Sequence, residues 1–195
     1  MGYRISRFIL FLIFKVLFRI EVKGGEYVPK KGGFILACNH ASYLDPPALG
    51  VGCPRIVSFM AKDELFSIPV LSGWLRAVEV LPVKRGSADI SAVKSAMKHI
   101  NSGKGLALFP EGTRQDPKAT PVKALAGVGF LAAKLNVPVI PAFIKGTEKA
   151  LPKGAKFIRP AKIRVYFGKE INIERGMPYQ DIAQMIMANI RQLPC

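Results

Sequence analysis

Two short stretches of the sequence contain residue types that together could move a proton beside an anionic ligand. The first, NHASYLD at residues 39–45, sets His40 five residues before Asp45. The second, FPEGTR at residues 109–114, ends in Arg114. A neutral imidazole can act as a general base near neutral pH, and a guanidinium group can bind phosphate oxygens with two parallel hydrogen bonds. The two stretches therefore predict proton transfer at a phosphate-binding site.

The spacing of His40 and Asp45 leaves two interpretations open. Five residues separate the side chains by about 140° on a straight helix, so they pair only if a turn or a helix start lies between them. Because Asp45 precedes Pro46, we expect it to be the N-cap of a helix. Asp45 could orient the imidazole by one ring nitrogen, leaving the other to accept a proton. Alternatively, Asp45 only caps the helix and His40 fills a crevice.

The FPEGTR stretch also has two interpretations. Gly112 allows a tight turn, after which Arg114 can reach a phosphate group. Glu111 could orient Arg114 or accept a hydrogen bond from a ligand hydroxyl. Alternatively, Glu111 and Arg114 form an ion pair that fixes the loop.

Short apolar runs alternate with helical patterns along the rest of the chain. Such alternation predicts an α/β fold, a mostly parallel sheet covered by helices on both faces. Ser87 is the expected cap of one helix, and Ile90 is expected on that helix's inward face. The expected strands lie at residues 34–38, 56–60, 78–83, 106–109, 139–144 and 163–167, and the expected helices at residues 88–100, 122–135 and 178–193.

The expected strands place the polar residues at one edge of the sheet. His40 follows the first strand, Lys84 and Arg85 the third, Glu111 the fourth and Lys145 the fifth. Ligands of parallel sheets bind at the carboxyl ends of the strands. This edge therefore combines one histidine with several cations, as expected of a phosphate site with a proton-transfer residue.

Residues 3–20 predict an amphipathic helix that lies on a membrane surface. Its cations fall within about 120° of each other and aliphatic residues fill the opposite side. We expect residues 1–23, which include this helix, to be a membrane-anchoring segment and residues 24–195 to be the α/β domain. A membrane-spanning helix, a cleaved signal peptide and an ordinary core helix are the alternatives. The expected membrane contacts are Arg4, Arg7, Phe11, Ile13, Lys15, Leu17 and Arg19.

Composition narrows the class of partner. The chain has 195 residues, with 29 Lys and Arg against 13 Asp and Glu, a net charge of +16, and 50% hydrophobic residues. Dispersed cations and an apolar excess favour a lipid partner over nucleic acid. Eight basic residues and one acidic residue in residues 145–169 could meet lipid headgroups or another anionic partner, or form a solvated face. With 2 His and 3 Cys, no metal site is expected.

One glycine pattern imitates a cofactor site. Gly127 and Gly129, with Ala132, match a dinucleotide-binding fingerprint, but no strand is expected before them. We therefore expect these glycines to serve helix packing.

Four blocks resemble those of the glycerolipid acyltransferase family, in particular its bacterial-type 1-acyl-glycerol-3-phosphate acyltransferases. They are NHASYLD, VLPVKR at residues 80–85, FPEGTR, and VPVIP at residues 137–141. The second block departs from the family pattern in the position of its glycine. The resemblance implies that His40 and Asp45 are the catalytic pair. It also implies a site for the acceptor's phosphate at Arg85, Glu111, Gly112, Thr113 and Arg114.

The resemblance further implies the reaction. A fatty acyl group passes from acyl-CoA or acyl carrier protein to the hydroxyl of 1-acyl-glycerol-3-phosphate (lysophosphatidic acid), giving phosphatidic acid, with no cofactor. We expect a monotopic enzyme on the cytoplasmic face of a bacterial cell membrane, with Phe59 among the residues lining the acyl approach. The alternatives are an acyltransferase for glycerol-3-phosphate or another lysophospholipid, and a non-catalytic lipid-binding membrane protein.

Overall fold

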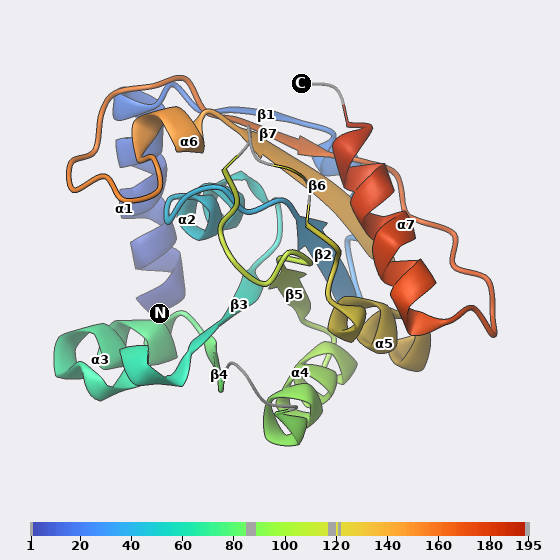
Figure 1. Cartoon of the computed structure of the whole chain (residues 1–195). Helices are drawn as coiled ribbons and strands as arrows, with labels where there is room; N and C mark the ends of the chain where they lie inside the picture. The colour runs from blue at the N-terminus through green and yellow to red at the C-terminus, as the bar shows by residue number, and fades with distance from the viewer. Residues whose placement is uncertain (1, 85–88, 117–119, 121, 194–195) are drawn as a thin grey trace.

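The fold is an α/β sandwich built on one mostly parallel sheet, as predicted. The computed structural model describes residues 2–84, 89–116, 120 and 122–193. The strands lie in the order β1-β7-β6-β2-β5-β3-β4, and only the β6–β7 pair is antiparallel among the pairs described (Figure 1). Their bounds are β1 Glu21–Lys23, β2 Phe34–Cys38, β3 Val57–Lys62, β4 Leu81–Val83, β5 Gly105–Leu108, β6 Val139–Lys145 and β7 Arg164–Phe167.

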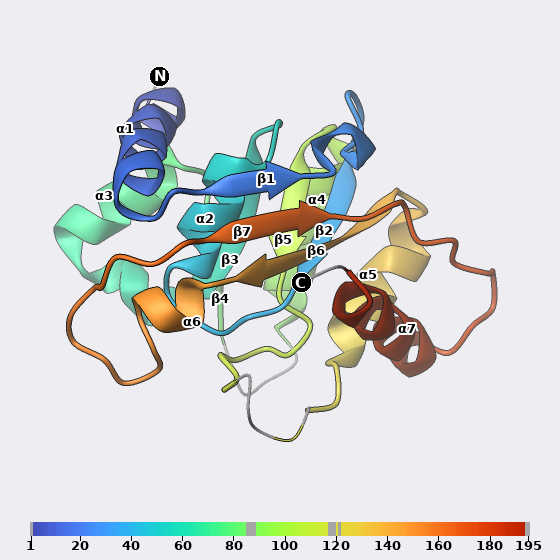
Figure 2. The same cartoon turned by 90° about the horizontal axis from the view of Figure 1, so that it is seen from above.

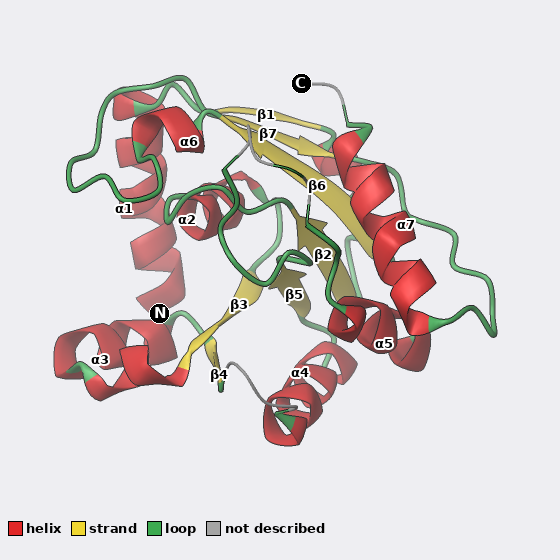
Figure 3. Ribbon diagram, viewed as in Figure 1, coloured by secondary structure: helices red, strands yellow, loops and turns green. Residues whose placement is uncertain are grey.

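Helices cover both faces of the sheet (Figures 2 and 3). α1, α2 and α6 contribute to the core on one face, and α4, α5 and α7 to the core on the other. α3 lies beside α1 at the edge of the molecule (Figures 1 and 2). The helices are α1 Gly2–Leu17, η1 Gly25–Tyr27, α2 Asp45–Gly52, η2 Asp63–Ser67, α3 Pro69–Ala77, α4 Ile90–Asn101, α5 Ala126–Leu135, α6 Thr147–Ala150 and α7 Tyr179–Arg191.

Strand β2 shows how the sequence builds two apolar layers. Successive side chains of a strand point to opposite faces. Phe34, Leu36 and Cys38 belong to one core, and Ile35 and Ala37 to the other, and all five are buried. A central parallel strand therefore reads as a continuous apolar run, FILAC, which is why its predicted bounds match the observed ones.

Helix α1 is packed into the fold rather than lying apart from it. Phe14 and Phe18, each no more than 2% exposed, enter the core beside α2. Arg7, one of the expected membrane contacts, is half-buried and donates from Nη2 to the carbonyl oxygen of Cys53 at 2.6 Å. The predicted helix of residues 3–20 ends at Leu17.

The opposite side of α1 is apolar and exposed. Among the described residues, no helix combines the length and the hydropathy needed to cross a membrane. The exposed apolar side chains of α1 are Ile5, Phe8, Ile9, Phe11, Leu12, Ile13, Val16 and Leu17.

One predicted strand starts later than expected and one observed strand was not predicted, while the other predicted strands agree with the observed bounds to within two residues. The strand expected at residues 78–83 begins at Leu81, because Val78 and Glu79 form the turn that ends α3. Glu79 has a φ of 58°, which a strand does not allow. β1 was not predicted, since three residues carry too little alternation to be recognised.

The helix boundaries differ for local reasons. α4 begins at Ile90, and its N-cap is Asp89, whose Oδ1 accepts from Ala92 N at 3.0 Å; the predicted cap, Ser87, lies outside the described residues. Ile90 is 66% exposed, so the prediction that it faces the core is wrong. α5 begins at Ala126 instead of residue 122. The sequence predicted the start of α2 at Asp45 and Pro46 but not its extent, and it did not predict α3 or α6.

Candidate active site

His40 and Asp45 form the predicted pair. His40 Nδ1 lies 2.8 Å from Asp45 Oδ2; the imidazole is 11% exposed and the carboxylate is fully buried. A proton on Nδ1 directed at the carboxylate leaves the lone pair on Nε2. The geometry therefore gives the imidazole a fixed orientation and a nitrogen that can accept a proton.

Asp45 acts differently from the expected N-cap. The N-cap of α2 is Leu44, and Asp45 is the first helical residue. Asp45 Oδ2 points back along the chain and accepts from the backbone N–H groups of Ala41 and Ser42, each at 2.7 Å. The turn between histidine and aspartate is thus closed by the same oxygen that orients the ring.

Glu111 holds the backbone of His40. Its Oε2 accepts from the N–H of His40 at 2.7 Å, while the N–H of Gln115 donates to the carbonyl of His40 at 2.7 Å. Burial raises the pKa of Glu111, and the His40 N–H opposes this shift. Sequence reasoning expected Glu111 to act on Arg114 or a ligand. The structure shows that it joins the loop after β5 to the loop after β2, which neighbours it in the sheet.

Arg114 stacks on an aromatic ring. Its guanidinium carbon lies 3.5 Å from the centroid of the Tyr43 ring, and Tyr43 is 67% exposed. The predicted alternative, an ion pair with Glu111, is not found among the described residues. The stack places Arg114 beside the His40 turn, to which Tyr43 belongs.

Gly112 makes the turn that the FPEGTR stretch requires. Its φ is 68°, and its N–H donates to the carbonyl of Phe109 at 2.9 Å. A Cβ atom at this position would lie 2.4 Å from Leu125 Cδ1. Thr113 is exposed, and its carbonyl accepts from the Gln115 side chain.

Asn39 has a role that sequence reasoning missed. Its Oδ1 accepts from the N–H of Ile144 at 2.7 Å and its Nδ2 donates to the carbonyl of Ile144 at 3.0 Å. The side-chain amide therefore imitates a strand and continues the pairing of β2 with β6 just before His40. An amide directly after a buried strand was the available signal.

An apolar cavity of about 850 Å³ opens beside the imidazole. The ring of Phe109 stacks on His40 with 4.2 Å between centroids, and Phe59 stacks on Phe109 at 6.5 Å. Residues of the loop after β5 and of α4 and α5 line the cavity. Its lining includes His40, Glu111, Gly112 and Thr113 from the predicted site, and Lys84, Ile90, Val93, Val128, Phe130 and Leu131.

The structure describes four of the five residues of the predicted phosphate site. Glu111, Gly112, Thr113 and Arg114 lie together on one loop beside His40. Lys84 lines the same cavity, whereas Arg85 lies outside the described residues.

Two nucleophilic side chains near His40, those of Cys38 and Ser42, are buried in the fold. Cys38 is fully buried, and burial, followed by the charges of Asp45 and Glu111, raises its pKa well above the usual value. Ser42 is also fully buried, and its hydroxyl donates to the carbonyl of Leu151 at 2.8 Å. Neither group is placed to be an activated nucleophile.

The fold and the site define an α/β protein with a histidine–aspartate pair next to an apolar cavity and an arginine. The Acyltransferase family profile matches residues 19–145, more than half of the chain. The chain therefore belongs to the acyltransferase family.

Individual relatives agree with this membership. A 1-acyl-sn-glycerol-3-phosphate acyltransferase of Bacillus subtilis is 29% identical over 154 residues, which are 78% of this chain and 74% of the relative. A chloroplastic enzyme of the same name from Brassica napus is 30% identical over 79% of this chain, but only 45% of the relative is covered. The crystal structure of the 1-acyl-sn-glycerophosphate acyltransferase PlsC from Thermotoga maritima matches with a TM-score of 0.81 at 24% identity, covering 97% of this chain and 78% of that one. This structure supports the fold.

Proposed function

We propose that this protein transfers a fatty acyl group from an acyl thioester to the free hydroxyl of 1-acyl-glycerol-3-phosphate, giving phosphatidic acid. The observation that carries the proposal is the His40–Asp45 pair, 2.8 Å apart beside an apolar cavity, in a chain of the acyltransferase family. Relatives named for this reaction support the choice of acceptor.

In the proposed mechanism His40 is the general base. Nε2 takes the proton of the acceptor hydroxyl while that oxygen attacks the thioester carbonyl. The C–S bond then breaks, and the imidazolium returns the proton to the thiolate that leaves. Asp45 stabilises the imidazolium through Nδ1. The acyl group passes directly to the acceptor, which agrees with the buried positions of Cys38 and Ser42.

The acceptor's phosphate is proposed to bind Arg114, with Arg85 as a second contact. A guanidinium group forms paired, charge-assisted hydrogen bonds to phosphate oxygens. Binding the phosphate would hold the hydroxyl against His40, so that proximity replaces a covalent enzyme intermediate. Acyl-CoA or acyl carrier protein is the proposed donor, and the reaction needs no other cofactor.

The apolar cavity is proposed to hold an acyl chain. Apolar side chains of α4 and α5 line it, and His40 lies at its wall, so a chain bound there would bring its carbonyl to the base. The enzyme is proposed to be monotopic and to bind the cytoplasmic face of the cell membrane. The exposed apolar side of α1 supports the attachment to a membrane.

A direct assay with lysophosphatidic acid and acyl-CoA or acylated carrier protein tests the proposal. His40→Ala should lower kcat by about 10³-fold while leaving the fold intact, since general base catalysis contributes about 10²–10⁴-fold. Asp45→Asn, which keeps an oxygen for the turn, should lose less. Retention of a tenth of the wild-type rate by His40→Ala would refute the general-base role. Parallel reactions with glycerol-3-phosphate and other lysophospholipids identify the acceptor, and no turnover with any of them would indicate a lipid-binding protein.

A further inference from the structure

The segment after α6 carries an exposed apolar pair between cations. Phe157 is 80% exposed and Ile158 is 56% exposed. Lys153, Lys156 and Arg159 surround them in the sequence, and no acidic residue occurs between Glu148 and Glu170. A single exposed apolar side chain is ordinary, but two adjacent large ones among cations need an explanation.

This segment, residues 151–159, is a closed loop and is named here the basic loop. The N–H of Arg159 donates to the carbonyl of Ala150 at 2.8 Å, which joins its two ends. Within it the N–H of Ala155 donates to the carbonyl of Pro152 at 3.0 Å, next to Gly154 with a φ of 86°. These hydrogen bonds therefore hold the loop in a defined conformation.

The basic loop projects on the side of the molecule where α1 and α3 lie. Figures 1 and 2 both show the loop after α6 extending toward that side, away from α5 and α7. The exposed apolar side chains of α1 include Phe8 and Val16, and those of α3 include Val70 and Trp74. Three separate segments that carry exposed apolar side chains thus lie on one side of the protein.

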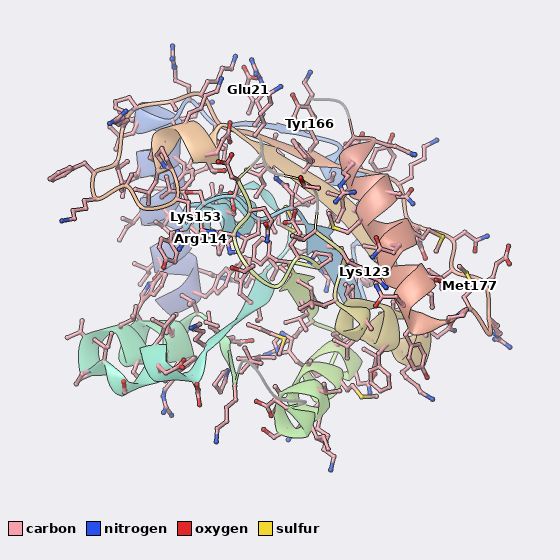
Figure 4. All side chains as sticks on the ribbon, viewed as in Figure 1. Glu21, Arg114, Lys123, Lys153, Tyr166 and Met177 are labelled. Carbon is pink, nitrogen blue, oxygen red and sulfur yellow. The ribbon has the colours of Figure 1, made fainter. Side chains whose placement is uncertain are left out.

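The base of the loop is bonded to the catalytic turn. The buried Ser42 hydroxyl donates to the carbonyl of Leu151 at 2.8 Å, and Ser42 is two residues from His40. In the view of Figure 4, Lys153 of the loop projects close to Arg114, which stacks on Tyr43. A surface that binds the loop would therefore be held at a fixed position relative to the active site.

We propose that the basic loop is a second membrane-binding element, which inserts Phe157 and Ile158 into the surface of an anionic bilayer while its lysines and arginine bind lipid phosphates. An aromatic and an aliphatic tip flanked by cations matches the chemistry of a lipid interface. We favour a lipid surface over an acidic protein because α1, on the same side of the molecule, also exposes apolar side chains. The inference rests on the proposed function only in that both place the protein on a membrane.

Sedimentation with vesicles tests the loop. The full chain is mixed with vesicles of phosphatidylglycerol and phosphatidylcholine in equal amounts. Phe157→Ser with Ile158→Ser should weaken partitioning by about tenfold, from the loss of two partly buried apolar side chains. The matched variant Phe157→Leu with Ile158→Leu keeps the apolar surface and should bind like the wild type. Equal binding by the serine and the wild-type proteins would overturn the proposal.

Fluorescence provides a second readout that does not depend on stability. Phe157→Trp in a Trp74→Phe background leaves one tryptophan, in the loop. Its emission should shift to the blue on vesicles and be quenched by brominated lipid. Unchanged emission on vesicles that the protein binds, or a shift with acyl carrier protein and none with vesicles, would overturn the proposal.

Activity separates the two proposals. The serine variant should lose turnover of lysophosphatidic acid held in vesicles but keep the wild-type rate with a short-chain acceptor that is monomeric in water. Equal loss with both acceptors would contradict a membrane role for the loop. A wild-type protein that binds vesicles through the loop yet shows no turnover would instead reject the proposed function alone.

Discussion

The stacking of Arg114 on Tyr43 determines where the guanidinium donors point. Those donors lie in the plane of the group, so a ring that covers its face leaves the edges free for phosphate oxygens. The contact, at 3.5 Å, comes from a residue between His40 and Asp45. Tyr43 therefore couples the position of Arg114, the proposed phosphate ligand, to the turn that carries His40, the proposed base.

Substitution of Tyr43 should affect acceptor binding more than chemistry. We expect Tyr43→Ala to raise the acceptor KM by about 2–5-fold, the loss of one exposed cation–π contact. Tyr43→Phe keeps the ring and should behave like the wild type. Arg114→Ala should raise the same KM by about 10–100-fold and also lower kcat, because a charged hydrogen bond and the hydroxyl's alignment are lost. Steady-state kinetics with the donor saturating measures both effects; an unchanged KM in Arg114→Ala would remove its phosphate role.

The sequence was sufficient for some of these contacts and not for others. The meeting of His40, Asp45 and Glu111 could be predicted, because neighbouring strand ends and a turn bring them together. The stack of Tyr43 could not, since an exposed aromatic residue in a turn has no periodicity. The partner of Glu111 was also missed, because a backbone N–H leaves no mark in the sequence.

Helices α5 and α7 pack too closely at Gly129 to leave room for a side chain. A Cβ at Gly129 would lie 1.9 Å from the carbonyl oxygen of Tyr179, whereas a Cβ at Gly127 would have no neighbour within 4 Å. The expectation that these glycines serve helix packing is thus confirmed for Gly129.

The two glycines form a matched pair for a stability test. Gly129→Ala should lower the free energy of unfolding by about 1–3 kcal/mol, the usual cost of overpacking. Gly127→Ala should cause no loss, because alanine favours the helix. Urea denaturation followed by circular dichroism measures both; equal losses would show that the close contact with α7 is not the cause.

The cap of α4 should make stability depend on pH. Asp89 accepts hydrogen bonds from the N–H of Lys84, the N–H of Ala92 and the hydroxyl of Ser91, which lower its pKa to about 2. Because the folded-state pKa is below the ordinary value of 3.8, the stabilisation is complete above that value and is lost as the pH falls toward 2.

Asp89→Ala should therefore lower Tm by about 2–4 °C at pH 7, as for one lost helix cap, and by less at pH 3. Asp89→Asn keeps an uncharged cap and should differ less from the wild type at pH 7. Thermal unfolding at the two pH values measures the differences. A deficit of the alanine variant that stays constant between pH 7 and pH 3 would contradict the assigned pKa.

The observed bounds of the strands and helices show where sequence patterns fail to predict the structure. The strand β2 was predicted to the residue because both of its faces are buried. The start of α5 was not, because the N–H of Leu125 donates to the carbonyl of Pro110 and holds the preceding residues on the FPEGTR loop. That long-range bond outweighs the local helical pattern of residues 122–125.

One side of the protein exposes apolar side chains that do not pack into the core. Periodicity predicted the cationic and aliphatic faces of α1, but it could not show which face the protein would cover. Packing against α2 turns Arg7 toward Cys53 and leaves Ile9, Leu12 and Val16 exposed. Arg4 and Lys15 remain exposed beside this apolar face. Deleting residues 1–20 would also remove Phe14 and Phe18 from the core, so point substitutions are the cleaner test of membrane binding.

Ile9→Glu with Val16→Glu should release the protein from vesicles without unfolding it. Both side chains point away from the core, so Tm should stay near the wild-type value, whereas Phe14→Ala should destabilise the fold by about 3–5 kcal/mol. Burying two carboxylates at a lipid surface is unfavourable, and partitioning should fall at least about tenfold. Raising the salt should weaken wild-type binding to anionic vesicles only in part. Salt screens the attraction between the lipid phosphates and a chain with net charge +16, but it does not weaken the burial of apolar side chains in the lipid. Vesicle sedimentation at 0.1 and 1 M salt measures this, and undiminished binding of the glutamate variant would show that α1 does not face the lipid.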